Sequence, residues 1–435
     1  MSITDNRDRR YTWAYALLFG FSCSINWYYT HFVISPLDTL DSDMLVYIEL
    51  AINFFYGYAP IEPYNTISLP GINYFYGIFF KIFGIASGFE VINAVQALIL
   101  AGINVLVGLT TYELFQRRRA AFVVAVAVTL YWPFLGLISY YMAELMDVFL
   151  ILLGQYALIR VLKYGGTWDR LVSIGIVLGL GMMMKGQAVV AFVAALLVIV
   201  LLPVGLGRRR WAAYLLVGFM LPIGLQMTLH HKINPASGWY MALVDSYNFY
   251  LAQSRRHGIG ALYWMGPASY VFHTYANDTN DERRFLPLAI EEASILDRSY
   301  YKQRSWELIR TQPQRQLERA VTSVRELFRY GEGWPFQSIP PVLGDSQSWH
   351  QARLWLIMLP GLFSLWLALF LGYYRWQVFL VSLPILGMIA MAVIYSGQPR
   401  YLLPFYYHFY ILAVPAYLVG IQVWERVWIF QRHPV

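Results

Sequence analysis

Apolar runs long enough to cross a lipid bilayer recur along the whole chain, and short basic or polar stretches separate them. A helix needs about 20 mostly apolar residues to cross the hydrocarbon core, so the pattern predicts about ten spans. They lie at about 12–33, 91–115, 120–137, 143–162, 171–184, 187–205, 211–229, 352–372, 376–395 and 401–424. We expect an all-α fold, a polytopic transmembrane helical bundle in which residues 1–435 form a single domain.

Lys and Arg residues cluster at the ends of these runs and thereby orient the predicted helices. Basic residues concentrate in cytoplasmic loops, so the basic N-terminal segment 1–10 is placed inside. The clusters at 117–119 and 208–210 then fall inside as well. This predicts a multi-pass protein of the plasma (inner) membrane with both termini cytoplasmic. It leaves two long segments outside, 34–90 and 230–350, and we expect the active site on that extracytoplasmic side.

The outer segments carry amphipathic stretches of their own. From Ser299 to Tyr330, apolar residues recur at mostly helical spacing between basic ones, which predicts a helix on the membrane surface. Pro313 should kink that helix or divide it in two. A second amphipathic, Tyr-rich stretch runs from Tyr47 to Tyr58.

Composition narrows the class of protein. With 58% hydrophobic and 13% charged residues, the chain does not fit a soluble protein. The net charge of +7 comes mainly from residues at span ends, so membrane lipids are expected as partners and nucleic acid is not. The one cysteine, Cys23, excludes an internal disulfide and a thiolate metal site.

Acidic residues follow the first predicted span. Asp43, with Tyr47 one turn further along, offers a carboxylate that can deprotonate an acceptor at the membrane surface. On spacing alone, helix capping and solvation are the simpler explanation of the same residues. Asp41-Ser42-Asp43 also has the D-x-D form that holds a divalent ion against a phosphate, but such pairs arise by chance in many loops. We expect no metal site and no cofactor.

Ionisable groups also stand near two other predicted outer turns. Glu144 and Asp147 share a helix face, and Glu144 is the second catalytic candidate, since charged groups at membrane depth usually line a cavity. Bonding to nearby tyrosines is the alternative. Lys185 can meet a lipid-linked phosphate as a point charge. It can equally extend to lipid headgroups.

Polar and aromatic residues of the second outer segment, and the start of the last span, are candidates for binding sugar or phosphate. They are Asn248, Tyr250, Arg255, Arg400 and Tyr401. Guanidinium groups match phosphate oxygens in pairs, and they match lipid headgroups equally well.

Five short motifs, in order along the chain, resemble those of the GT-C superfamily of membrane glycosyltransferases. The likeness is to the branch that contains protein O-mannosyltransferases and the aminoarabinose transferases of lipid A. The motifs are Asp43-x-x-x-Tyr47-x-Glu49-x-Ala51, Pro70 through Tyr74, Lys185-Gly186, Asn248-Phe249-Tyr250-Leu251 and Arg400-Tyr401-Leu402-Leu403-Pro404.

The resemblance implies a GT-C-type bundle that uses a polyprenyl-phosphate sugar donor, inverts the anomeric carbon and employs Asp43 as general base. Lys185 and Arg400 would face the phosphate leaving group, and Tyr74 would help to bind substrate. The acceptor would be a lipid, a glycan or a protein. Two positions depart from the pattern: Met44 stands where many members have Glu, and Leu69 stands where a basic residue is common.

Two other functions remain open at this point. A transporter or flippase of lipid-linked saccharides would also need many spans, but it predicts repeat symmetry and charges spread across the bilayer midplane. The notable acids gather instead at the predicted outer face. A polymerase or ligase of lipid-linked glycans would use the same residues.

Overall fold

The computed structural model describes most of the chain. The described residues are 3–37, 43–56, 69–201, 208–233, 298–328, 346–395 and 399–432, with the single residues 239, 249, 253 and 397. These residues are almost all helical, and no strand occurs among them. The expected all-α fold is confirmed.

The described residues form α-helices and a few short 3-10 and π segments. In chain order they are α1 (Ile3–Tyr28), η1 (Tyr29–Val33), α2 (Asp43–Tyr56), α3 (Gly71–Phe83), α4 (Ile85–Phe115), α5 (Arg118–Leu130), η3 (Trp132–Ile138), α6 (Glu144–Tyr164), α7 (Trp168–Met184), α8 (Ala188–Leu201), α9 (Arg208–Ile233), α13 (Arg298–Thr311), α14 (Pro313–Leu327), α15 (Ser346–Arg353), η7 (Leu354–Met358), α16 (Leu359–Leu371), α17 (Arg375–Ile394) and α18 (Pro399–Arg432).

Each predicted span coincides with a helix or with consecutive helical segments, but fewer of them meet the requirements for crossing a membrane. Six helices of the described part are long and apolar enough, or seven if α5 and η3, bent by 64°, form one span. With 17 and 14 residues, α7 and α8 are shorter than a full span. A multi-pass membrane protein is confirmed, and the count of about ten spans is not.

Local sequence explains where several helices end. Pro133 stands at the start of η3, where a missing backbone N–H costs least, and the chain bends there. Gly84 has a φ of 78°, a conformation that suits glycine, and it lets the chain turn from α3 into α4. Pro313 divides the predicted surface helix into α13 and α14, as expected.

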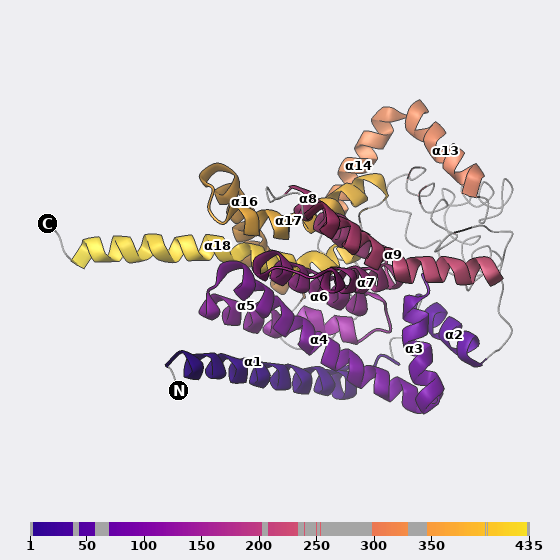
Figure 1. Ribbon diagram of the computed structural model, residues 1–435, viewed down its shortest axis with the longest axis horizontal. Coiled ribbons are helices and arrows are strands. Elements are labelled where there is room, and N and C mark those ends of the chain that lie inside the picture. Colours follow the sequence, from indigo (N-terminus) through magenta and orange to yellow (C-terminus); the bar gives the residue numbers. More distant parts are fainter. Residues whose placement is uncertain are drawn as a thin grey trace.

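Helices of the predicted outer segments lie at the end of the molecule opposite to the two termini. In Figure 1 the beginning of α1 and the end of α18 lie at the same end of the bundle, whereas α2, α3 and α13 lie at the opposite end. The C-terminal end of α9 also reaches toward α2 and α3. This arrangement gathers parts of the two predicted outer segments.

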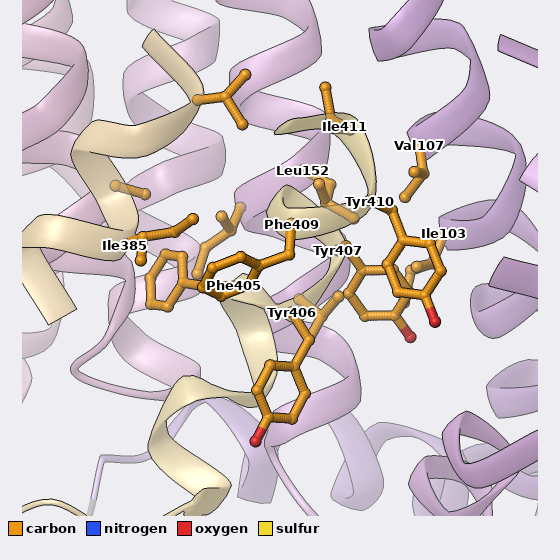
Figure 2. Close-up of a cluster of buried hydrophobic side chains, with 14 of the residues drawn as sticks. Ile103, Val107, Leu152, Ile385, Phe405, Tyr406, Tyr407, Phe409, Tyr410 and Ile411 are labelled. Atoms are coloured by element: carbon orange, nitrogen blue, oxygen red, sulfur yellow. The ribbon is translucent and has the colours of Figure 1, made fainter. Parts of the chain in front are cut away.

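The last helix runs through the main hydrophobic core. Figure 2 shows aromatic side chains of α18 beside aliphatic side chains of α4, α6 and α17. The residues labelled there are Ile103, Val107, Leu152, Ile385, Phe405, Tyr406, Tyr407, Phe409, Tyr410 and Ile411. Among the side chains of α18 that the structure describes, the buried ones begin at Leu402, close to the start of the helix.

Candidate active site

The N-terminal turn of α6 places two carboxylates in the protein interior. Glu144 is 1% exposed and Asp147 is fully buried. They lie three residues apart and therefore on one face of the helix. Both are in the first turn, where the positive end of the helix dipole favours negative charge. Buried carboxylates still need a compensating partner.

Lys185, which ends α7, supplies that partner. Its ammonium forms an ion pair with Glu144 Oε1, and its side chain is 17% exposed. Within the described residues, neither carboxylate oxygen of Asp147 has a hydrogen-bond partner. Asp147 lies within electrostatic reach of Lys185, so one ammonium serves two buried acids. The sequence singled out these residues one by one, and the structure brings them together.

The helices of the first outer segment pack against this group. Met44 at the start of α2 and Tyr76 on α3 share a buried apolar cluster with 140–143, the stretch that directly precedes Glu144. The Tyr76 hydroxyl donates to the Met142 carbonyl oxygen at 3.4 Å. The first turn of α2 therefore lies near the carboxylates.

Two candidates belong to this helix. Asp43 is the first residue of α2, next to the buried Met44, but its side chain lies outside what the structure describes. Tyr47 is half-buried and packs against the same apolar cluster.

The start of α3 meets the end of α7. A Cβ added at Gly71 would lie 2.7 Å from the carbonyl oxygen of Met183, so the two backbones are in direct contact. Only glycine fits such a close approach. The contact lies two residues before Lys185.

Tyr74 connects α3 to α9. Its hydroxyl donates to Gln226 Oε1 at 3.0 Å, and Gln226 Nε2 lies 2.7 Å from His230 Nε2. Gln226 and His230 are both buried, and sequence reasoning missed them. The available signal was two polar residues four apart, and so on one face, at the end of an apolar span.

On its other side, the turn that carries Lys185 contacts the start of α18. Gln187 Nε2 donates to the Tyr401 carbonyl oxygen at 3.5 Å. Tyr401 is half-buried and follows Arg400, the second residue of α18. The side chain of Arg400 is outside the described part of the chain. The backbone nevertheless places Arg400 near the Lys185 turn.

Two described residues in and near the Asn-Phe-Tyr motif, Phe249 and Gln253, lie against the C-terminal end of α17. Gln253 Nε2 donates to the Ile394 carbonyl oxygen at 2.6 Å. The ring centroid of Phe249 lies 5.7 Å from that of Tyr395 and 6.1 Å from that of Trp306. Phe249, the central residue of the Asn-Phe-Tyr motif, thus lies close to Tyr395 at the end of α17, five residues before Arg400.

The helix α14 contacts the C-terminal end of α17 and Gly397, which precedes α18. Arg319 donates to the carbonyl oxygens of Val393 and Tyr395 at 2.7 and 3.0 Å. A Cβ added at Gly397 would lie 1.5 Å from the carbonyl oxygen of Ser323. At Gly397, the backbone between α17 and α18 therefore lies directly against the backbone of α14.

Several predicted residues cannot be compared with the structure. Asp41, Asn248, Tyr250 and Arg255 lie outside the described residues. Among the residues that are described, no group of three or more His, Cys, Asp or Glu side chains is placed to hold a metal. Since Asp41 is not among them, the D-x-D question stays a prediction.

Solved structures share this fold. The oligosaccharyltransferase of Archaeoglobus fulgidus in complex with zinc and sulfate matches with a TM-score of 0.53 and 14% identity. That match covers 94% of this chain and 49% of the other. The same enzyme tethered to an acceptor peptide matches with a TM-score of 0.50 and 13% identity, covering 96% and 50%. The chain spans about half the length of these structures. The chain therefore shares the fold of this oligosaccharyltransferase.

Sequence comparison adds a more particular likeness. Residues 63–230 match the family model described as dolichyl-phosphate-mannose-protein mannosyltransferase. The match includes Tyr74, Glu144 and Lys185 and does not reach Asp43 or Arg400. None of the curated proteins matches the chain.

Proposed function

We propose that this chain is a membrane glycosyltransferase that moves a sugar from a polyprenyl-phosphate carrier to a lipid, glycan or protein at the extracytoplasmic membrane face. The observation that carries the proposal is the buried Glu144–Lys185 ion pair, which lies beneath α2 and α3 and beside the start of α18. The description of the matching family, whose donor is a dolichyl-phosphate sugar, supports the donor class.

In the proposed reaction, the Asp43 carboxylate accepts the proton of the acceptor hydroxyl or amine. The freed electron pair attacks the anomeric carbon from the side opposite the phosphate, so the configuration inverts. The bond between that carbon and the phosphate oxygen breaks, and its electrons leave with the polyprenyl phosphate. A fixed positive charge lowers the barrier because negative charge grows on that oxygen. Lys185 and Arg400 supply this charge.

Glu144 acts in this scheme by holding Lys185. In the absence of donor, the ammonium has a buried carboxylate partner and cannot extend freely into the lipid headgroups. The donor phosphate then attracts an ammonium that is already placed, which reduces the entropy lost on binding. The helices around this position carry Tyr47, Tyr74 and Tyr401. These tyrosines are proposed to contact the sugar or the lipid carrier.

The direct test is transfer by the purified full chain carrying Asp43→Asn. Loss of a general base should lower turnover by about 10²–10⁴-fold while donor affinity stays within about twofold of wild type. Glu90→Gln, at an exposed position on α4, is the matched control and should keep full turnover. Near-normal turnover in Asp43→Asn would remove Asp43 from the reaction. Activity lost in the presence of a chelator and restored by manganese or magnesium would instead favour the D-x-D metal site.

A further inference from the structure

A second buried cation lies on a different helix from the residues of the Glu144–Lys185 pair. Arg353 ends α15 and is 4% exposed, in a helical stretch long and apolar enough to cross a membrane. An arginine side chain in a protein is always charged. Removing such a charge from water costs several kcal/mol unless an opposite charge compensates it.

The partners of Arg353 are neutral. Its guanidinium carbon lies 3.8 Å from the ring centroid of Tyr406 and 5.7 Å from that of Tyr131. Its Nη2 lies 2.8 Å from His350 Nδ1, and that nitrogen must be unprotonated if it accepts the bond. Within the described residues, no carboxylate pairs with Arg353 and its buried Nε has no hydrogen-bond partner.

The contrast with Lys185 shows what is missing. Lys185 has the buried carboxylate of Glu144, whereas Arg353 has two aromatic rings and an imidazole. A guanidinium has five N–H donors in a planar fork, and the neutral partners use only part of them. Two parallel donors on such a fork match the oxygens of a phosphate group. An anion is therefore the ligand that would compensate this charge.

The surroundings point to a lipid as the carrier of that anion. Directly after Arg353, the π-helix η7 exposes Leu354, Trp355 and Leu356, which are 37%, 67% and 58% exposed. Acyl chains can lie along these side chains while a headgroup reaches the guanidinium. Short π-helical segments occur frequently at functional sites. Tyr406, whose ring contacts the guanidinium, lies on α18 five residues beyond Tyr401. This spacing corresponds to about 7.5 Å along the helix axis.

We propose that Arg353, together with His350 and Tyr406, binds the phosphate group of a membrane lipid. The site is built from α15, η7 and α18, and the Glu144–Lys185 pair lies on α6 and at the end of α7. Binding at Arg353 does not depend on sugar transfer, so the proposal stands or falls separately from the proposed function.

The experiment measures lipid binding by calorimetry to the purified full chain in a neutral detergent. The probes are dioctanoyl phosphatidic acid, dioctanoylglycerol, which lacks the phosphate, and inorganic phosphate. Wild type should bind the phosphatidic acid and not the diacylglycerol. Arg353→Met, which keeps an unbranched apolar stem, should weaken that binding by about tenfold or more. Arg310→Met, at an exposed position on α13, is the matched control and should bind as wild type does.

A second variant covers the case in which Arg353→Met does not fold. Arg353→Lys keeps the charge and removes the fork, so it should fold like wild type and bind the phosphatidic acid several-fold more weakly. Affinity within twofold of wild type in the variant that folds overturns the proposal. Equal affinity for inorganic phosphate and phosphatidic acid overturns the lipid as ligand, and diacylglycerol binding equal to that of phosphatidic acid overturns the phosphate.

Discussion

The candidate site places two buried carboxyl groups beside one cation. Glu144 and Asp147 are both buried, and Lys185 is the cation that the described residues place beside them. A buried ion pair adds little net stability, but removing one member leaves an uncompensated charge and is costly. The pair is therefore expected to be sensitive to single changes and tolerant of a balanced double change.

Replacing Lys185 tests this balance. Lys185→Met should lower the free energy of unfolding by about 3 kcal/mol, because two buried carboxylates lose their cation. Adding Glu144→Gln should restore part of the loss, with a coupling energy of about 1–3 kcal/mol in a double-mutant cycle. Reversible unfolding in mixed micelles measures both. Lys302→Met, at an exposed position on α13, should change stability by less than about 0.5 kcal/mol. If the stability changes of Lys185→Met and Glu144→Gln simply add in the double variant, the two side chains do not interact directly.

At the residue scale, the sequence indicated which ionisable residues are unusual, but it did not indicate which of them contact one another. Glu144 and Lys185 stood out because ionisable groups are rare inside apolar spans. Their pairing could not be read from the sequence, since they lie 41 residues apart and meet through the packing of α6 on α7. Nothing in the sequence distinguishes Arg353 from an ordinary basic residue at a span end, because its burial comes from tyrosines on other helices.

At the scale of elements, the position of the first outer segment depends on close backbone contact. The start of α3 touches the end of α7 at Gly71, and the apolar cluster of α2 and α3 covers the stretch before Glu144. Helical spacing predicted the surface helix and Pro313 predicted its division. The packing of α3 on α7 was not predictable, because a single glycine has many other possible roles.

Gly71→Ala tests whether this contact positions the site. The added methyl group meets a backbone that cannot move aside easily, so the variant should lose about 1–3 kcal/mol of stability and most of its transfer activity. Gly20→Ala, where nothing lies within 4 Å of the added atom, should be neutral or slightly stabilising. Thermal unfolding and a transfer assay on both variants give the comparison. Equal stability and equal transfer activity of the two variants would show that the α3–α7 contact can accommodate a methyl group and does not position the site.

At the scale of the whole molecule, both termini lie at one end of the bundle (Figure 1). The helices α2, α3 and α13, which belong to the predicted outer segments, lie at the other end. The positive-inside rule predicted this arrangement from loops alone, since basic residues alternate with apolar runs regardless of tertiary contacts. The number of true spans could not be predicted in the same way. Runs such as α7 and α8 are short, so packing against neighbours and not length decides how they sit in the bilayer.

Labelling of single cysteines tests the orientation. In a Cys23→Ser background, Ile82→Cys lies on α3 and Trp168→Cys lies at the start of α7, and both parent side chains are exposed, at 66% and 64%. A membrane-impermeant maleimide applied to intact cells should modify Ile82→Cys and leave Trp168→Cys unmodified until the cells are lysed. The opposite pattern would place the candidate site on the cytoplasmic side and contradict a donor used outside.

The position of the carrier phosphate is the most direct measure of the central claim. A structure of the full chain with a bound polyprenyl phosphate should place the phosphate within about 4 Å of the Lys185 ammonium and the Arg400 guanidinium, the distance of an ion pair. The Asp43 carboxylate should face the sugar side of that phosphate. A phosphate bound away from Lys185, or an Asp43 carboxylate directed into bulk water with no adjoining pocket, would contradict the proposed glycosyl transfer.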